Sequence, residues 1–217
     1  MALALFDLDN TLIAGDSDLL WGQFLGEQGL VDAVAHNRSN ERFFQDYRDG
    51  TLDIRAYLRF QLKFLAAHDP DQLRAWRAVY VEEKIRPVLL PKAGPLLERH
   101  RRAGDTLVII TATNRFVTEP IADLLEVSHL IATEPEIRAG RYTGEVCGTP
   151  SFAAGKVERL HSWLRTHPHE LAESWFYSDS HNDLPLLGIV ANPVAVDPDA
   201  ILGAAALKNR WPVISLR

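Results

Sequence analysis

Residues 2–16 read ALALFDLDNTLIAGD, an apolar run that ends in two aspartates one residue apart. The apolar part, residues 2–6, is short and uninterrupted, which predicts a buried β-strand. Asp7 would then follow the carboxyl end of this strand, where open α/β sheets bind their ligands. Asp7 and Asp9 would repel each other there unless a cation neutralised them. The stretch therefore indicates a divalent-metal or acid–base site, although an Asp-rich turn with Thr11 opening a helix is the alternative.

The composition is that of an ordinary globular protein. The chain has 217 residues, of which 47% are hydrophobic and 24% charged, and its formal net charge is −6. This length allows one large domain, or one domain with an insert, without stabilising disulfides. No clustered basic run marks a nucleic-acid-binding face, and no apolar stretch approaches the length of a membrane span. We therefore expect neither nucleic acid nor a membrane as partner.

Cys147 is the single cysteine of the chain. It excludes a disulfide framework or a multi-cysteine zinc site within one chain, and we interpret it as an inert packing residue rather than a nucleophile. The first residues lack the basic region and the cleavage-like segment of a secretory signal, because the acidic Asp7 interrupts them. We therefore expect a cytoplasmic protein.

The hydrophobic pattern changes character twice along the chain. Residues 16–86 place apolar side chains at helical spacing and contain no convincing strand. From Pro91 onward, strand-like runs such as DTLVIITAT alternate with helical segments such as FAAGKVERLHSWLRTH. This alternation is typical of an α/β fold with a doubly wound, Rossmann-like parallel sheet. We predict a core formed by residues 1–14 and 88–217, with residues 15–87 inserted as an all-helical cap.

Two later segments carry polar groups that could meet Asp7. Thr111 ends a β-rich run, and its hydroxyl and the N–H groups of the following turn at Ala112 could donate to an anion. A threonine that only fills a strand-end turn is the alternative. Lys156 lies in the first turn of a predicted helix, where the helix dipole disfavours a cation. It either points at an anion or is a solvated surface lysine.

A second acidic loop, SDSHNDLP, follows another predicted strand. Asp179 and Asp183 lie four residues apart in this loop, with Ser180 and Asn182 between them. Such oxygen-rich loops suit magnesium. Asp183 could instead cap the helix that follows it. Parallel strands would bring this loop to the same edge of the sheet as Asp7.

Taken in this order, the segments resemble the motifs of the haloacid dehalogenase superfamily over the whole chain. The helical insert is similar to the cap of the phosphoserine-phosphatase-like branch. The resemblance implies that Asp7 is the nucleophile and Asp9 the general acid/base. It also implies that Thr111 binds phosphate, and that Lys156 steadies Asp7 and the phosphoryl oxygens.

The resemblance further implies a Mg²⁺ cofactor. Its ligands would be the carboxylates of Asp7 and Asp179 and the main-chain carbonyl of Asp9, supported by Asp183. The expected activity is hydrolysis of a small phosphorylated metabolite through an aspartyl-phosphate. A carboxylate at position 9 resembles the phosphatases and phosphomutases of the superfamily rather than its transport ATPases or dehalogenases. Transfer to another alcohol, as in a mutase, and a catalytically silent binding module are the alternatives.

Three places in the sequence, one of them a pair of residues, depart from the pattern of phosphoserine phosphatases. Asp16 stands where they have a glutamate that meets the substrate amine, and Gln61 stands where an ungapped match places a carboxylate-binding arginine. The glycine pair after the motif-two hydroxyl is Ala112-Thr113, which predicts a tighter loop. Glutamine cannot supply the bidentate grip of arginine. If Asp16 faces the cavity, we therefore expect an amino-alcohol phosphate such as histidinol phosphate as the substrate, and a phosphoserine phosphatase is the alternative. Asp16 could instead be only a helix N-cap, and Gln61 only an ordinary helix-face residue.

Overall fold

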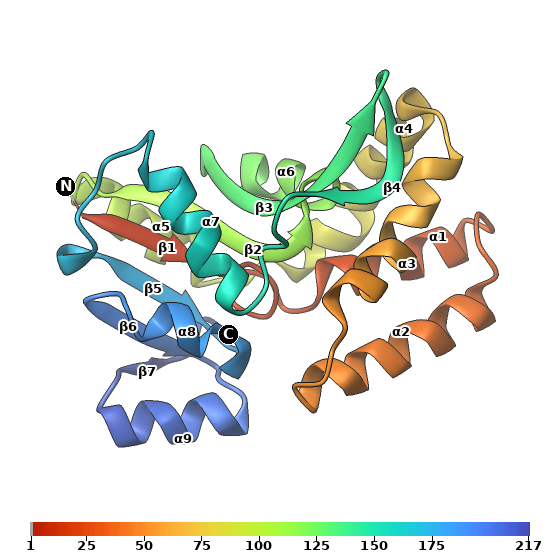
Figure 1. Cartoon of the computed structure of the whole chain (residues 1–217). Helices are drawn as coiled ribbons and strands as arrows, with labels where there is room; N and C mark the ends of the chain where they lie inside the picture. Colours follow the sequence, from red (N-terminus) through yellow and green to blue (C-terminus); the bar gives the residue numbers. More distant parts are fainter. Residues whose placement is uncertain (1) are drawn as a thin grey trace.

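The computed structural model describes residues 2–217 and arranges them around one seven-stranded sheet (Figure 1). The strands lie in the order β4-β3-β2-β1-β5-β6-β7, and all neighbours are parallel except β3 and β4. The predicted α/β core is therefore confirmed, with one antiparallel strand added at an edge. The strands are β1 (Leu3–Phe6), β2 (Thr106–Asn114), β3 (His129–Arg138), β4 (Arg141–Cys147), β5 (Trp175–Ser178), β6 (Asn192–Val196) and β7 (Val213–Ile214).

Helices cover both faces of the sheet, and β1 lies between them. The helices of this layer are α5 (Ala93–Arg102), α6 (Arg115–Leu124), α7 (Ala154–Leu164), α8 (Leu184–Leu187) and α9 (Ala200–Asn209). Leu3 and Leu5 pack in the hydrophobic cluster that includes α7, α8 and α9, whereas Ala4 and Phe6 pack in the cluster that includes α5 and α6. Burial on both faces explains why β1 is continuously apolar.

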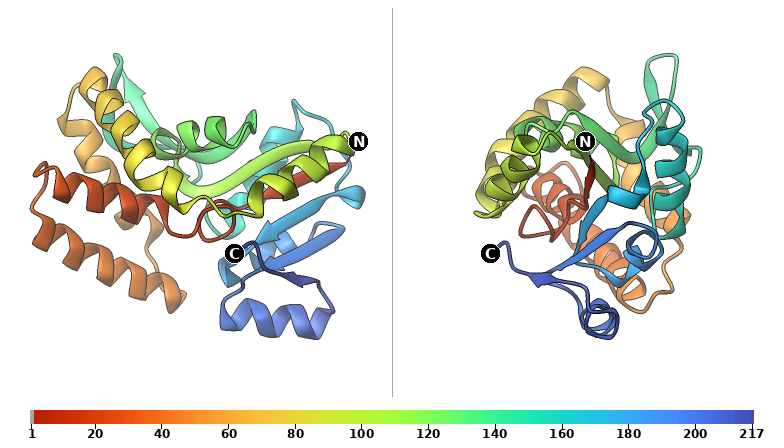
Figure 2. Two further views of the ribbon diagram at one scale, coloured as in Figure 1. Left: turned by 180° about the vertical axis from the view of Figure 1, so that it is seen from behind. Right: turned by 90° about the vertical axis from the view of Figure 1, so that its left-hand side faces the viewer.

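Four helices follow β1 and lie beside one end of the sheet (Figures 1 and 2). They are α1 (Ser17–Glu27), α2 (Ala33–Arg48), α3 (Ile54–Ala67) and α4 (Pro70–Tyr80). Each begins after an aspartate whose side chain accepts a backbone N–H of the first turn, at Asp16, Asp32, Asp53 and Asp69. Such N-caps satisfy donors that have no partner inside the helix. The chain then returns to the sheet through a π-helical turn (Val81–Ile85) and a 3₁₀ turn (Arg86–Val88).

The helical insert shares its hydrophobic core with one face of the sheet. Trp21 stacks on Phe24 with ring centroids 5.5 Å apart, and its edge meets the Phe116 ring of α6 at 5.7 Å. All three side chains are almost fully buried and belong to the cluster of α5 and α6. This shared cluster fixes the insert over the carboxyl ends of the strands. Its assignment as a separate cap domain, residues 15–87, stays a prediction.

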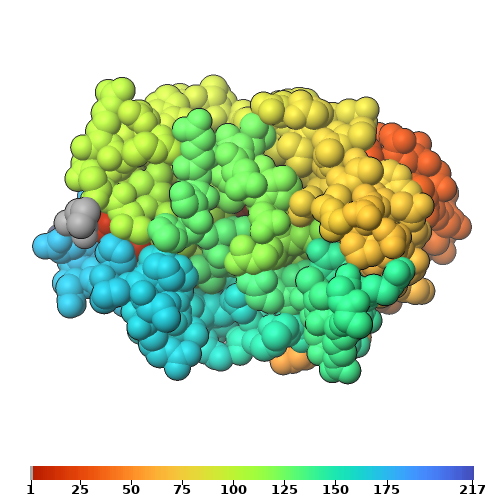
Figure 3. Space-filling view, turned by 90° about the horizontal axis from the view of Figure 1, so that it is seen from above, coloured from red at the N-terminus to blue at the C-terminus, as the bar shows by residue number. Residues whose placement is uncertain are grey.

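The hairpin of β3 and β4 reaches out from the sheet and lies against the insert. Ala139 and Gly140 form its turn, with φ values of 48° and 76°. Positive φ at both central residues matches the twist of a two-residue hairpin. The Arg141 guanidinium lies 3.6 Å from the carboxylate of Asp69, the N-cap of α4. Figure 3 shows the hairpin and the α4 segment on one face of the molecule.

Cys147 is the last residue of β4, and its side chain is exposed. The expectation of an inert packing residue was therefore wrong. The pattern of the hairpin places alternate residues of β4 toward solvent, and position 147 falls on an exposed one. Within residues 2–217, no helix combines the length and apolar character needed to span a membrane.

Candidate active site

The polar residues singled out from the sequence meet at the carboxyl ends of the three central strands. Asp7 follows β1, Thr111 lies near the end of β2, and Asp179 follows β5. Both β2 and β5 pair with β1, so the strand order reverses at β1. Open α/β sheets bind their ligands at this switch point.

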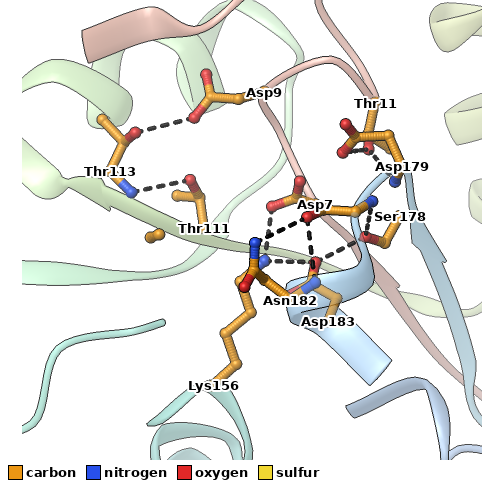
Figure 4. A network of polar contacts seen from close by, with 12 residues as sticks. Asp7, Asp9, Thr11, Thr111, Thr113, Lys156, Ser178, Asp179, Asn182 and Asp183 are labelled. Carbon is orange, nitrogen blue, oxygen red and sulfur yellow. Dashed lines mark hydrogen bonds and ion pairs between the residues drawn. The ribbon is translucent and has the colours of Figure 1, made fainter. Parts of the chain in front are cut away.

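Lys156 reaches this edge from the first turn of α7 (Figure 4). Its Nζ lies 2.8 Å from Asp7 Oδ1 and 2.7 Å from Asp183 Oδ2. The lysine side chain is only 4% exposed, so these two carboxylates provide its charge partners. Burial and two close anions exclude the alternative of a solvated surface lysine.

Asp183 is a member of this ion-pair cluster rather than a helix cap. Its Oδ2 accepts hydrogen bonds from Lys156 and from Ser178 Oγ, the latter at 2.7 Å. Its side chain makes no capping hydrogen bond to α8. The Asp183 carboxylate therefore helps to hold the Lys156 ammonium group beside Asp7.

Asp9 points away from this cluster, toward β2 and the insert. Its Oδ2 accepts the hydroxyl of Thr113 at 2.9 Å, and its Oδ1 accepts the backbone N–H of Ser17 at 2.7 Å. Asn10 follows with φ 56°, in the left-handed region that asparagine tolerates better than most residues. This turn separates the directions of Asp7 and Asp9, so the two carboxylates have different environments.

Thr113 is a site residue that the sequence reasoning missed. The expectation of a tight loop after Thr111 was wrong, because β2 continues as extended strand to Asn114. Residues two apart in a strand share a face, so Thr111 and Thr113 both line the cavity with Ala112 between them. The Thr111 hydroxyl oxygen accepts the Thr113 N–H at 3.2 Å, which leaves its own O–H free to donate.

Asp179 is fixed by a residue from the first motif. Its backbone N–H donates to Thr11 Oγ1 at 3.1 Å, while the Thr11 hydroxyl lies 3.2 Å from Asp179 Oδ1. The two threonine contacts tie the loop after β5 to the turn after β1. Burial raises the pKa of Asp179 well above its usual range, and the charges of Asp7 and Asp183 raise it further.

Asp16 is both the N-cap of α1 and a residue of the cavity lining. Its Oδ1 accepts the Leu19 N–H at 2.9 Å and so caps α1, and its side chain also lines the cavity. Burial raises its pKa, and the capping N–H groups lower it. Contact between Asp16 and a substrate amine stays a prediction.

Gln61 lies behind the cavity wall, with 5% of its surface exposed. Its Nε2 donates to the hydroxyl of Tyr57 at 2.9 Å and lies 3.4 Å from Asn40 Oδ1. Tyr57 and Asn40 line the cavity in its place. Any influence of Gln61 on a substrate would therefore pass through these two side chains.

The cavity has an acidic floor and a largely aromatic wall. The exposed arginines of α2 and α3 do not line this cavity: Arg42, Arg48, Arg55 and Arg59. Among residues 2–217, the lining contains one cation, Lys156. The other lining residues are Asp7, Asp9, Asn10, Asp16, Leu19, Asn40, Phe43, Phe44, Tyr47, Leu52, Ile54, Tyr57, Thr111, Ala112, Thr113, Phe152, Asp179, Asn182 and Asp183.

The excess of buried carboxylates fits a divalent cation. Burial, together with the charges of Asp183 and Asp9, raises the pKa of Asp7 to about 7 against the opposing effect of Lys156. Within residues 2–217, no three His, Cys, Asp or Glu side chains are arranged to enclose a metal by themselves. Magnesium commonly takes one or two carboxylates and keeps several waters. The carboxylates of Asp7 and Asp179, with the Asp9 carbonyl, would suffice.

The raised pKa values predict how the metal-free protein responds to pH. Burial raises the pKa of Asp7 to about 7 and that of Asp9 to about 6, above 3.8 in both cases. The folded protein then binds protons more tightly than the unfolded chain, so its stability falls as the pH rises from about 4 to about 7. Bound Mg²⁺ would offset this loss because it neutralises the ionised carboxylates.

Thermal unfolding in EDTA and in Mg²⁺, at pH 5 and pH 7.5, measures this effect. We expect Mg²⁺ to raise the melting temperature more at pH 7.5 than at pH 5. The same comparison in the Asp179→Asn variant should show a smaller Mg²⁺ effect at pH 7.5. Equal Mg²⁺ increments at both pH values would contradict the prediction.

Comparison with known proteins agrees with this geometry. Residues 4–188 match the family model for haloacid dehalogenase-like hydrolase. The chain is 43% identical, over 99% of both lengths, to a histidinol-phosphatase from Neisseria meningitidis serogroup C. A crystal structure of a Bordetella pertussis protein of unknown function has a TM-score of 0.94 at 44% identity, covering 100% of this chain and 99% of that one.

A substrate-bound phosphoserine phosphatase complex shares the fold, with a TM-score of 0.71 at 17% identity over 100% of this chain and 93% of that one. The fold and the site together are those of a class of hydrolases. This chain belongs to the haloacid dehalogenase-like hydrolase family. Within that family it is a phosphatase, with the fold of the phosphoserine phosphatases.

Proposed function

We propose that the protein is a magnesium-dependent phosphatase that hydrolyses an amino-alcohol phosphate, such as histidinol phosphate, through an aspartyl-phosphate intermediate. The observation that carries the proposal is the cavity lining, in which Lys156 is the single cation among the described residues and faces several carboxylates. The Neisseria relative is named a histidinol-phosphatase, which supports the same substrate class.

In the first half-reaction, a carboxylate oxygen of Asp7 attacks the phosphorus atom. The bond from phosphorus to the alcohol oxygen breaks, and protonated Asp9 gives its proton to that oxygen. Lys156, 2.8 Å from Asp7, is close enough to stabilise the phosphoryl oxygens together with the hydroxyl of Thr111. The products are the free alcohol and phosphorylated Asp7.

In the second half-reaction, ionised Asp9 takes a proton from a water molecule whose oxygen attacks the same phosphorus. Phosphate leaves, and the Asp7 carboxylate and the protonated Asp9 are restored. Burial raises the pKa of Asp9 to about 6, so both of its protonation states are accessible near neutral pH. When bound, Mg²⁺ would supply positive charge against the phosphoryl oxygens.

The electrostatics of the cavity favour a substrate that has an amine and no carboxylate. A carboxylate on the substrate would lie among Asp16, Asp9 and the other acidic groups without an arginine to receive it. An ammonium or imidazolium group would instead be attracted by Asp16 and by the aromatic rings of Phe43 and Tyr57. The same lining thus favours an ester that has an amine alone and disfavours an ester that has a carboxylate.

A panel of phosphate esters, assayed with the purified protein and Mg²⁺, tests the proposal. We expect kcat/KM for histidinol phosphate to exceed that for phosphoserine by about 100-fold, because like charges placed together cost several kcal/mol. Glycerol phosphate, which carries neither amine nor carboxylate, is the matched control and should lie between them. Comparable turnover of phosphoserine and histidinol phosphate would contradict the proposal.

A further inference from the structure

A network of buried polar side chains lies behind the wall that the insert contributes to the cavity. Asn114 Nδ2 donates to Asp18 Oδ1 at 3.0 Å, and the Tyr57 hydroxyl donates to Asp18 Oδ2 at 3.3 Å. Gln61 Nε2 donates to the Tyr57 oxygen at 2.9 Å and lies 3.4 Å from Asn40 Oδ1. The five residues come from β2, α1, α2 and α3, so the network joins the sheet to three helices of the insert.

Asp18 is the single carboxyl group of this network, and it is 1% exposed. Its hydrogen-bond partners, Asn114 and Tyr57, are both uncharged. Burial raises the pKa of Asp18 well above its usual range, and the nearby charge of Asp16 raises it further. A buried acidic group without a cation is costly to a fold. The phosphoryl-transfer scheme above makes no use of it, so its presence calls for another role.

Tyr57 stands between Asp18 and the cavity. It lines the cavity together with Asn40, whereas Asp18 and Gln61 lie behind them. Because its O–H is donated to Asp18 and one lone pair accepts from Gln61, its oxygen keeps one lone pair for a further donor. The Phe43 ring meets the Tyr57 ring edge to face at 5.4 Å. This wall therefore combines a hydrogen-bond acceptor with aromatic faces, which suits a flat or cationic N–H group.

We propose that Tyr57, paired with Asp18, is the specificity-determining residue for the nitrogen-bearing end of the substrate, whose N–H it accepts. The inference rests on the proposed function, since it presumes an amino-alcohol phosphate. It places the phosphate at the Lys156 end of the cavity and the nitrogen group at the Tyr57 end. It assigns substrate choice to side chains that take no part in phosphoryl transfer.

Tyr57→Phe removes the acceptor and keeps the ring. We expect this variant to raise KM for histidinol phosphate by about 10- to 100-fold, the effect of losing a hydrogen bond to a charged group. The loss of kcat/KM should be larger for histidinol phosphate than for p-nitrophenyl phosphate, because p-nitrophenyl phosphate has no N–H donor and loses no hydrogen bond. Asp18→Asn keeps the size of the side chain but offers one acceptor oxygen to two donors, Asn114 Nδ2 and the Tyr57 hydroxyl. It should therefore displace the Tyr57 oxygen and also raise KM for histidinol phosphate.

Tyr47→Phe is the matched control for loss of a tyrosine hydroxyl from the same cavity. The Tyr47 hydroxyl lies 2.6 Å from Ser180 Oγ, on the loop after β5, and so has a partner in the protein away from Asp18. Any effect of this variant should fall equally on histidinol phosphate and p-nitrophenyl phosphate. Thermal unfolding of all three variants identifies a loss that comes from misfolding.

Inhibition by histidinol separates this inference from the proposed function. Histidinol, which has the nitrogen groups and lacks the phosphate, should inhibit p-nitrophenyl phosphate hydrolysis competitively in the wild type. Its inhibition constant should rise by about 10-fold or more in Tyr57→Phe and in Asp18→Asn. Failure of histidinol to inhibit the wild type, or equal inhibition of wild type and folded variants, would overturn the inference. Poor turnover of histidinol phosphate despite inhibition by histidinol would count against the proposed function alone.

Discussion

Replacement of Asp7 by asparagine should lower kcat for p-nitrophenyl phosphate in Mg²⁺ by at least ~10³-fold, because removal of a nucleophile eliminates the covalent route. The amide keeps the shape of the carboxylate but cannot attack phosphorus at a useful rate. The substitution also removes the repulsion between the negative charge of Asp7 and those of Asp183 and Asp179. We therefore expect the melting temperature of the metal-free variant to equal or exceed that of the wild type.

The combination of lost activity and retained stability distinguishes a chemical role from a structural one. Asp69→Asn is the matched control, since asparagine is as good an N-cap as aspartate and α4 contributes no residue to the cavity. This control should keep wild-type activity. Unchanged hydrolysis by Asp7→Asn would remove the assigned nucleophile.

Replacement of Lys156 by methionine should damage both activity and stability. Methionine fills a similar volume but leaves Asp7 and Asp183 without the cation that lies 2.8 and 2.7 Å from them. Removal of one partner from a buried ion pair costs ~3–5 kcal/mol of stability. The loss of charge stabilisation at the phosphoryl group should lower kcat by about 10²- to 10³-fold. Urea unfolding and steady-state kinetics measure the two effects.

A double variant identifies the source of the destabilisation. Lys156→Met combined with Asp183→Asn removes the cation and one of the carboxylates that it leaves unpaired. Because the two residues are in contact, their effects should not add, and the double variant should be more stable than Lys156→Met alone. A double variant that is no more stable would show that the unpaired carboxylate is not the cause.

The residues at the strand ends could be placed from the sequence because topology alone brings them together. Once β1, β2 and β5 are recognised as parallel neighbours, Asp7, Thr111 and Asp179 must share one edge of the sheet. These inferences needed only the order and direction of the elements. The position of Lys156 in the first turn of a helix indicated an anion as one of two possibilities, and the structure decided between them.

The residues of the insert could not be placed in the same way. Apolar spacing in α3 correctly indicates a buried stripe that includes Leu58, Leu62 and Leu65. It does not indicate which side of that stripe faces the strands, because the orientation of a helix depends on its packing partners. Tyr57 therefore lines the cavity while Gln61, one turn later, lies behind it.

The contact of Asp9 with the first turn of α1 has a consequence for mutational tolerance. The donor at position 17 is a backbone N–H and the serine is fully buried, so the 2.7 Å bond to Asp9 Oδ1 should survive substitution by another small residue but not by proline, which has no N–H. The serine hydroxyl itself has no hydrogen-bond partner among the described residues. Alanine or glycine at position 17 should therefore still hold Asp9, the proposed proton-transfer group, to the insert, because the contact depends on the backbone and not on the side chain.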